Sequence, residues 1–249
     1  MNTYLRNLEK IEFVVTDACT GRCKHCSEGD HTGCNDSIDP RIAAEVVRKV
    51  AKVYNIQTVM VFGGEPLLHP DAVYSIIGAA LDLKIEHRQI ITNGFFSQNP
   101  DYIRRVAFGL YNSGVNDLLL SVDSFHQETI PLSPVMDFAR EVLEFGIPIR
   151  LSPAWLVSPN DDNPYNERTR EILSEFSGMN VTIGAGNIVF PEGNALKYLS
   201  QYFSGHTPIN PYVEDPYAVK CLSVSANGDV LNGNIYRMDI IDIIDNYTP

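Results

Sequence analysis

The chain has 249 residues and a mass of 27.8 kDa, which suits one large domain. Apolar residues make up 44% of it, so wholesale disorder is excluded. With 19 basic against 31 acidic residues the net charge is −12, which disfavours nucleic acids and anionic membrane surfaces as partners. No apolar run is long enough to span a bilayer and the first residues do not resemble a signal peptide, so we expect a cytoplasmic protein.

Short apolar runs alternate with helical stretches through the first 190 residues. The runs are rich in Val, Ile, Leu and Phe with little polar alternation, which is typical of strands covered on both faces. Strands are expected at residues 11–16, 58–62, 89–92, 117–122, 147–152 and 180–184. Helices are expected between them at residues 40–54, 71–83, 101–112, 133–145 and 166–177.

This alternation is the signature of successive βαβ units. A complete eight-unit barrel takes about 250 residues. Six units therefore predict an α/β fold with a partial (β/α)6 TIM-like barrel, followed by a small extension. An open doubly wound sheet is the alternative, because periodicity does not separate the two. We expect the core to occupy residues 1–190 and the extension residues 191–249.

The extension has a different rhythm. A helix is expected at residues 194–203, and residues 205–216 are rich in Pro and Asn, which is typical of a loop. Asn227-Gly228, between apolar runs at 221–226 and 230–231, predicts a β-hairpin. A short helix is expected at residues 239–245.

Four of the five cysteines lie close together, just after the first expected strand. The first three, Cys19, Cys23 and Cys26, have the spacing C-x3-C-x2-C. Three thiolates on one loop are enough to bind three irons of a cubic four-iron cluster and leave the fourth iron open. A structural zinc site with Cys34 or His25 as the fourth ligand is the alternative. Zinc sites usually have a second distant cysteine pair, which is absent here, and Cys34 is expected not to be a ligand.

Small and polar motifs follow the next strands. They are Gly63-Gly64-Glu65-Pro66 after the second strand, Thr92-Asn93-Gly94 after the third, Ser121-Val122-Asp123 after the fourth and Ser152 after the fifth. The carboxyl ends of parallel barrel strands form one rim, which is where barrel enzymes react. We therefore expect these motifs to meet the cysteine loop at that rim.

With the cysteine loop and these motifs in this order, the chain resembles the radical S-adenosylmethionine (radical SAM) enzymes over about residues 11–190. The resemblance implies one 4Fe-4S cluster, bound by Cys19, Cys23 and Cys26, and S-adenosylmethionine bound at its open iron. It also implies reductive cleavage of S-adenosylmethionine to a 5′-deoxyadenosyl radical, which abstracts a hydrogen atom from the substrate. An electron donor such as flavodoxin or ferredoxin is the implied partner.

Under this resemblance the rim motifs bind S-adenosylmethionine. The expected cofactor-binding residues are Gly63, Gly64, Glu65, Asn93, Ser121, Asp123 and Ser152. The two glycines let the backbone approach a ligand closely, and Glu65 accepts hydrogen bonds from the methionyl ammonium group. His25 and the backbone of residues 185–187 are expected near the adenine. The alternative for the glycines and Asn93 is a purely structural turn.

The tail that begins at Cys221 resembles the hairpin of SPASM and twitch enzymes, a peptide-modifying subgroup. No cysteine follows Cys221, so no auxiliary cluster is expected. The motif at Asp123 also lacks the glycine and nearby arginine of that subgroup, which leaves the partner of the methionyl carboxylate unassigned. The expected substrate is a ribosomally synthesised peptide (a RiPP precursor) that is epimerised or cross-linked. A small metabolite is the alternative, and a non-catalytic zinc-binding or redox-sensing protein is the rival class.

Three further positions carry hypotheses. Cys221 is the candidate catalytic residue for epimerisation, because a thiol is a suitable hydrogen-atom donor to a substrate radical. A buried core cysteine and a relic cluster ligand are its alternatives. Trp155 and Tyr165 flank a polar loop that is expected to be either a substrate lid or ordinary surface. His126 is expected to contact the substrate or simply to be hydrogen-bonded.

Overall fold

The computed structural model describes residues 2–31, 36–203 and 208–249. Its centre is a parallel seven-stranded sheet in the order β7-β5-β4-β3-β2-β1-β9. The strands are β1 (Lys10–Val14), β2 (Thr58–Phe62), β3 (His87–Thr92), β4 (Asp117–Leu120), β5 (Ile149–Leu151), β7 (Val181–Ile183) and β9 (Cys221–Val224).

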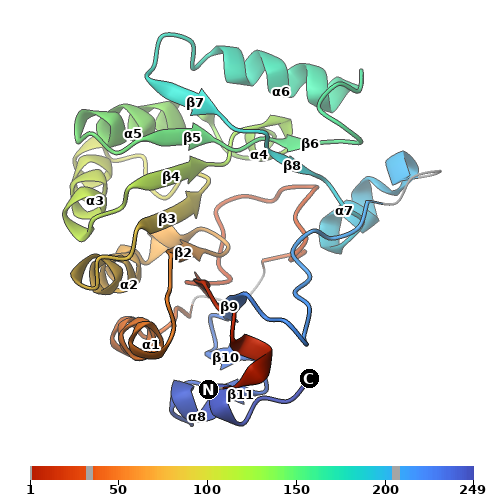
Figure 1. Cartoon of the computed structure of the whole chain (residues 1–249). Helices are drawn as coiled ribbons and strands as arrows, with labels where there is room; N and C mark the ends of the chain where they lie inside the picture. The colour runs from red at the N-terminus through yellow and green to blue at the C-terminus, as the bar shows by residue number, and fades with distance from the viewer. Residues whose placement is uncertain (1, 32–35, 204–207) are drawn as a thin grey trace.

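The sheet is curved, with helices along its convex side (Figure 1). From β1 to β7 the strand order follows the chain without reversal. A doubly wound sheet reverses its strand order and carries helices on both faces, so that alternative is wrong. The expected partial TIM-like barrel is confirmed.

Five long helices cover the convex side. They are α1 (Pro40–Val53), α2 (Pro70–Asp82), α3 (Pro100–Ser113), α5 (Leu132–Glu144) and α6 (Pro164–Ser174). Asp39, Asn99 and Asn163 cap α1, α3 and α6 through their side-chain oxygens, and a proline follows each cap in the first turn. The expected strands of the core and the five expected helices agree with the observed ones to within three residues at each end.

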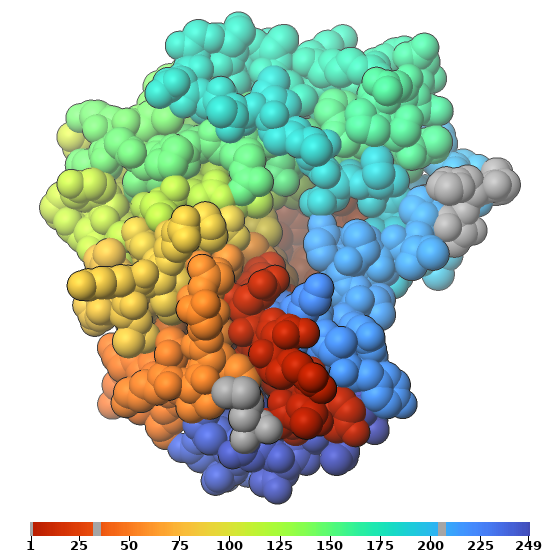
Figure 2. Space-filling view, in the orientation of Figure 1, coloured from red at the N-terminus to blue at the C-terminus, as the bar shows by residue number. Residues whose placement is uncertain are grey.

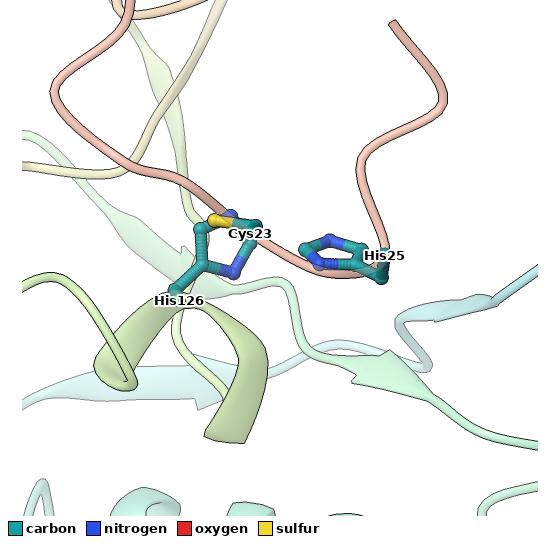
Figure 3. A group of neighbouring side chains, drawn as sticks. All are labelled: Cys23, His25 and His126. Carbon is teal, nitrogen blue, oxygen red and sulfur yellow. The ribbon is translucent and has the colours of Figure 1, made fainter. Parts of the chain in front are cut away.

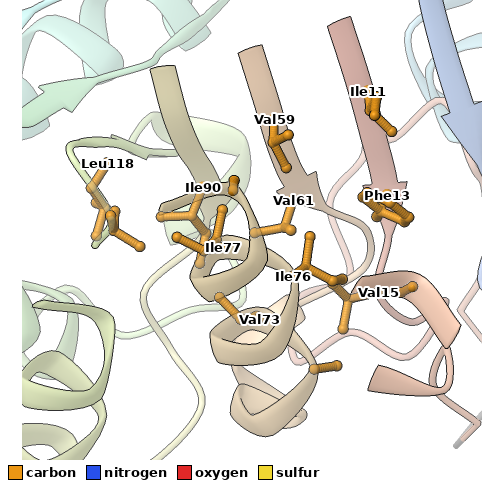
Figure 4. Packing of buried hydrophobic residues seen from close by; sticks show 14 of the residues in the cluster. Ile11, Phe13, Val15, Val59, Val61, Val73, Ile76, Ile77, Ile90 and Leu118 are labelled. Carbon is orange, nitrogen blue, oxygen red and sulfur yellow. The ribbon is translucent and has the colours of Figure 1, made fainter. Parts of the chain in front are cut away.

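The core lies between these helices and the sheet. Ile11 and Phe13 of β1, Val61 of β2 and Ile90 of β3 are fully buried on the helix-covered side of the sheet, and Val61 and Ile90 lie beside Ile76 of α2 (Figure 4). Because successive side chains of a strand point to opposite faces, the residues between these face the concave side of the sheet. Figure 2 shows the molecule hollowed between the sheet, in yellow and green, and the extension, in blue.

Several short elements have no counterpart among the expectations. They are α4 (Ser124–Gln127), the parallel pair β6 (Ala154–Trp155) and β8 (Asn187–Ile188), and the 3-10 turns Thr3–Leu5 and Pro66–Leu68. The helix expected at 194–203 is split into α7 (Gly193–Tyr198) and a 3-10 turn, Ser200–Phe203. The loop expected at 205–216 lies partly outside the described residues. Elements this short carry no measurable hydrophobic period.

The turn expected at Asn227-Gly228 is present, since the Ser225 N–H donates to the Asp229 carbonyl over 2.9 Å, but the apolar runs on its two sides do not pair as a hairpin. β9 pairs in parallel with β1, and the hairpin of the extension is formed instead by β10 (Asp229–Val230) and β11 (Gly233–Asn234). Gly228 lies in this turn with φ at 85°. The apolar run of β9 is compatible with a hairpin partner or with the edge of the main sheet, and in the structure it pairs with β1. α8 (Ile240–Asp245) confirms the expected short helix. No helix in the described part of the chain is long and apolar enough to cross a membrane.

Candidate metal centre

The three clustered cysteines lie on the loop that follows β1. Cys23 is buried, and Cys19 and Cys26 are half-buried. The loop turns on itself: the Gly21 N–H donates to Cys19 Sγ over 3.4 Å, and the Cys26 N–H donates to the Cys23 carbonyl over 3.3 Å. No described cysteine forms a disulfide. Cys34, expected not to be a ligand, lies outside the described residues.

Without a cation this loop disfavours thiolates. Burial raises the pKa of Cys19 to about 11 and also raises the pKa of Cys26. Burial, the charge of Asp123 and the other two thiols together raise the pKa of Cys23 well above its ordinary value. Three soft sulfur donors that repel one another as anions fit an iron–sulfur cluster, because a bound cation keeps coordinating thiols deprotonated.

Two histidines lie beside Cys23 (Figure 3). Cys23 Sγ and one ring nitrogen each of His25 and His126 all lie within 4.8 Å of one another. Burial lowers the pKa of His25 to about 4, and its Nδ1 is buried with no hydrogen-bond partner among the described residues. One thiol and two imidazoles are also zinc ligands, so this group offers zinc a second set of donors beside the three cysteines with His25.

Asp123 holds His126 in place. Its fully buried carboxylate accepts hydrogen bonds from His126 Nδ1 (2.9 Å), from the His126 N–H (3.0 Å) and from the Ala154 N–H (2.9 Å). Burial by itself raises the pKa of Asp123, but the charge and hydrogen bonds of His126 outweigh it and hold the pKa well below its usual range. Three donors leave one of about four acceptor positions for the contact with S-adenosylmethionine expected from the sequence.

Glu65 joins the ends of β2 and β3. Its Oε1 accepts hydrogen bonds from the Leu67 N–H (2.9 Å) and the Thr92 hydroxyl (2.8 Å), and its Oε2 accepts one from the Asn93 N–H (2.9 Å). The side chain is fully buried, and burial raises the pKa of Glu65 to about 7 despite these donors. Here too a single acceptor position is left for the expected ammonium contact.

The glycines before Glu65 are explained by the protein's own loop. A Cβ on Gly63, whose φ is 144°, would lie 2.5 Å from the Thr16 carbonyl oxygen, and one on Gly64 would lie 2.1 Å from the Ala18 carbonyl oxygen. The Gly64 N–H donates to the Thr16 carbonyl over 2.8 Å. Both positions therefore require glycine because the backbone comes close to the start of the cysteine loop. Their approach to a ligand stays a prediction.

Ser121 and Ser152 provide free hydroxyl groups at the same rim. They follow β4 and β5, and the register of Leu120 opposite Leu151 places them side by side. Both residues are half-buried, and neither hydroxyl bonds to any described residue. Asn93, the remaining expected residue, points its Nδ2 at Cys19 Sγ over 3.6 Å. The rim thus gathers every expected metal-binding and cofactor-binding residue.

Two residues that sequence reasoning missed hold the cysteine loop from outside. Asn194, buried at the start of α7, donates its Nδ2 to the Cys23 carbonyl (3.2 Å) and its N–H to the Cys26 carbonyl (2.8 Å). His31 bonds through Nδ1 to the Asp17 carbonyl (2.7 Å) and places Nε2 3.2 Å from Cys26 Sγ. His31 could have been predicted from its position five residues after Cys26. Nothing in the sequence around Asn194 indicates its contact with the cysteine loop.

The structure does not bring Cys221 to this rim. It lies opposite Lys10, at the amino end of β1, whereas the cysteine loop follows the carboxyl end. Burial, reinforced by the nearby Glu12, raises the pKa of Cys221 well above its ordinary value. The hydrogen-donor role predicted for Cys221 therefore has no support in the geometry.

The expected lid is a packed segment. Trp155 is buried in β6 and donates its indole N–H to the Ala185 carbonyl (2.9 Å). Tyr165 stacks on Phe125 with ring centroids 4.6 Å apart. Directly after Tyr165, the fully buried Asn166 fastens the loop through hydrogen bonds to backbone groups. These contacts favour the structural alternative for this loop.

Comparison with known proteins gives a consistent set of relatives. Residues 13–151, more than half of the chain, match the Radical SAM superfamily. The GTP 3′,8-cyclase of Listeria monocytogenes is 28% identical over 162 residues, which cover 61% of this chain and 47% of that protein. A probable GTP 3′,8-cyclase of Saccharolobus islandicus is 25% identical over an alignment of 279 residues, covering 96% and 87%. The chain spans about half the length of the Listeria relative.

Solved structures share the fold. SuiB of Streptococcus suis bound to S-adenosylmethionine is 14% identical with a TM-score of 0.59, covering 95% of this chain and 65% of that one. Native anSMEcpe with bound AdoMet is 13% identical with a TM-score of 0.56, covering 95% and 80%. At such identities the similarity establishes the fold alone, and it agrees with the partial barrel described above.

Proposed function

The chain belongs to the radical S-adenosylmethionine superfamily, with a 4Fe-4S cluster and S-adenosylmethionine as its cofactors, and from this premise we propose that it generates a substrate radical on a ribosomally synthesised peptide. The observation that carries the proposal is the placement of Cys19, Cys23 and Cys26 on one loop at the carboxyl end of the sheet. That end also carries free hydroxyl groups on adjacent strands. Epimerisation and cross-linking are the two outcomes we propose.

When bound, the two cofactors supply, after one-electron reduction, a 5′-deoxyadenosyl radical that abstracts a hydrogen atom from the substrate. In our proposal Cys19, Cys23 and Cys26 hold the cluster. The hydroxyl groups of Ser121 and Ser152 hydrogen-bond to polar groups of S-adenosylmethionine in our proposal. Among the expected cofactor-binding residues, these two have hydroxyl groups without a hydrogen-bond partner in the described part of the chain.

The remaining rim residues support this arrangement. Glu65 and Asp123 use most of their acceptor positions to fix the ends of β2, β3 and β4, so the groups they hold are preorganised. Each keeps one acceptor position for S-adenosylmethionine. In our proposal His25, whose Nδ1 has no hydrogen-bond partner among the described residues, lies near the adenine.

Two cations on the concave side of the sheet are paired with carboxylates, which weighs against a nucleoside triphosphate at that surface. Lys10 is paired with Glu12 at 2.9 Å, and Arg150 is paired with Asp117. A triphosphate requires cations that are free to bind its oxygens, whereas these two are already neutralised. SuiB, one of the structural neighbours, has been solved bound to the precursor peptide SuiA.

A small nucleotide is the second candidate substrate, and a specific observation favours it. The sequence relatives named GTP 3′,8-cyclase are more similar to this chain than the peptide-bound structural neighbour is. The proposed electron donor, flavodoxin or ferredoxin, suits either substrate. The proposed cytoplasmic location also suits either one, and free thiols persist in such a reducing compartment. We assign catalysis to residues 1–190 and treat residues 191–249 as a SPASM/twitch-like remnant without an auxiliary cluster.

The proposal is tested first on the metal. Purified without oxygen and reconstituted with iron and sulfide, the protein is expected to bind about four irons per chain. With dithionite it should then release 5′-deoxyadenosine from S-adenosylmethionine. A colourless protein that takes up one zinc and no iron would contradict the proposal and support the zinc alternative.

The substrate class needs a separate measurement. The reconstituted protein is incubated with short peptides encoded next to its gene and, in parallel, with GTP, and the products are analysed by mass spectrometry. For epimerisation we expect a peptide of unchanged mass in ordinary water and about one mass unit heavier in deuterated water. For a cross-link we expect the loss of two hydrogens. Turnover of GTP alone would replace the peptide with the nucleotide.

A further inference from the structure

We infer that Asn93 tunes the cluster: its side-chain amide donates a hydrogen bond to the sulfur of Cys19 and thereby raises the reduction potential of the iron–sulfur cluster. The inference rests on the proposed function only in that a cluster must bind. It gives Asn93 a different role from the S-adenosylmethionine contact expected from its motif.

The orientation of the amide is fixed by its neighbours. The backbone N–H of Phe95 lies 2.8 Å from one amide atom of Asn93, and since an N–H can only donate, that atom must be Oδ1. The other amide atom is then Nδ2, which lies 3.2 Å from the Thr20 hydroxyl and 3.6 Å from Cys19 Sγ. The group that faces the sulfur is therefore a donor.

Asn93 has little freedom to turn away. Its side chain is 5% exposed, and its backbone N–H is held by the buried carboxylate of Glu65 at 2.9 Å. The next residue, Gly94, has φ at 73°, a conformation that fixes the tight turn at the end of β3. The amide is thus presented to the cysteine loop by a rigid turn, which is the arrangement expected of a residue that supports a metal ligand.

The effect on the cluster follows from charge. Reduction adds an electron to the cluster and its sulfurs, so a donor to sulfur stabilises the reduced state more than the oxidised state. Cys19 receives two such donors, the Gly21 N–H at 3.4 Å and the Asn93 amide. The backbone donor is present whatever the sequence, whereas the amide belongs to Asn93 alone. Removing it should make the reduction potential more negative.

Asn93→Asp tests this most directly. The aspartate keeps an oxygen for the Phe95 N–H but replaces the donor by an acceptor, so the midpoint potential should shift to more negative values. Asn93→Ala removes the donor without adding charge, and its shift should have the same direction and be smaller. Both are measured by redox titration of the reconstituted protein, followed through the electron paramagnetic resonance signal of the reduced cluster.

Asn99→Asp is the matched control. It makes the same substitution at the exposed cap of α3, where an aspartate can still accept the Tyr102 N–H (3.1 Å), so the potential should not move. Folding is checked by circular dichroism, and Asn93→Ala carries the test if Asn93→Asp does not fold. Loss of iron from folded Asn93→Ala, with iron retained by the control, would make Asn93 a structural support of the cysteine loop and overturn the tuning role. Full iron content with the wild-type midpoint potential in both Asn93 variants would overturn it, whereas a wild-type protein without a cluster would overturn the proposed function instead.

Discussion

The two ends of the parallel sheet differ in how their polar groups are used. At the carboxyl end, Glu65 and Asp123 are fully buried and fasten neighbouring loops, leaving Ser121 and Ser152 free beside the cysteine loop. At the amino end, Cys221 lies next to strand β1 near the Lys10–Glu12 ion pair. The length of β1, about 13 Å at 3.3 Å per residue, separates the two ends.

This difference shows that position along a strand decides what a cysteine can do. The thiols of Cys23 and Cys221 both have pKa values raised mainly by burial. Only Cys23 lies among other soft donors, with two thiols on its own loop and two imidazoles beside it. Four experiments break or sharpen the comparison, from the largest expected effect to the smallest.

Replacing a loop cysteine should have the largest effect. In Cys23→Ser one of the three proposed iron ligands is lost, and the rate of 5′-deoxyadenosine formation should fall more than about 100-fold, beyond the 10–100-fold typical of residues that only support a ligand. Cys19→Ser and Cys26→Ser should behave alike. Iron content and 5′-deoxyadenosine are measured together. A variant that keeps full iron and activity would remove its cysteine from the ligand set.

Glu65 should make the cluster-free protein less stable as the pH rises. Its pKa in the folded state is about 7, above its ordinary value near 4.5, so the folded state binds the proton more tightly. The associated stability is present below about pH 4.5 and is lost as the pH rises through about 7, by about 3 kcal/mol in the free energy of unfolding.

The measurement compares urea unfolding of the wild type and Glu65→Gln between pH 4.5 and 8. Their difference isolates Glu65, because His25, whose pKa is lowered to about 4, changes stability with pH in the opposite sense in both proteins. Parallel pH profiles for the two proteins would contradict the prediction.

Two glycines of the same region should respond in opposite directions to alanine. Gly64→Ala places a methyl group 2.1 Å from the Ala18 carbonyl oxygen and should destabilise the protein by about 3 kcal/mol while displacing the cysteine loop. Gly78→Ala, in the middle of α2 with open space around it, should stabilise the protein by about 0.5–1 kcal/mol. Urea unfolding and iron content are measured on both. Equal iron content in the two variants would show that the loop does not depend on Gly64.

Cys221→Ala should have the smallest effect. Product formation should stay within about twofold of the wild type, and the free energy of unfolding should fall by less than about 1 kcal/mol for one half-buried sulfur. If the variant cleaved S-adenosylmethionine normally but failed to complete the product, Cys221 would regain the donor role predicted from the sequence.

Much of the fold, and the set of residues that meet at the carboxyl end of the sheet, could be predicted from the sequence. Buried parallel strands read as continuous apolar runs, and helix starts are marked by local caps such as Asp39 and Asn99. The spacing of Cys19, Cys23 and Cys26 is local too, because a loop of eight residues carries all three. These features depend only on neighbours in the chain, so no tertiary contact is needed to recognise them.

Tertiary structure alone decided the partners of the polar groups and the position of the last strand. The residues next to Glu65 in the chain do not indicate whether its carboxylate binds a ligand or the Thr92 hydroxyl, because a carboxylate suits both. Asn194 reaches the cysteine loop across 171 positions of the chain, and β9 joins β1 in parallel although its apolar run also suits a hairpin. Contacts between distant segments are set by which surfaces remain to be paired after the local elements have formed, and the sequence does not record those surfaces.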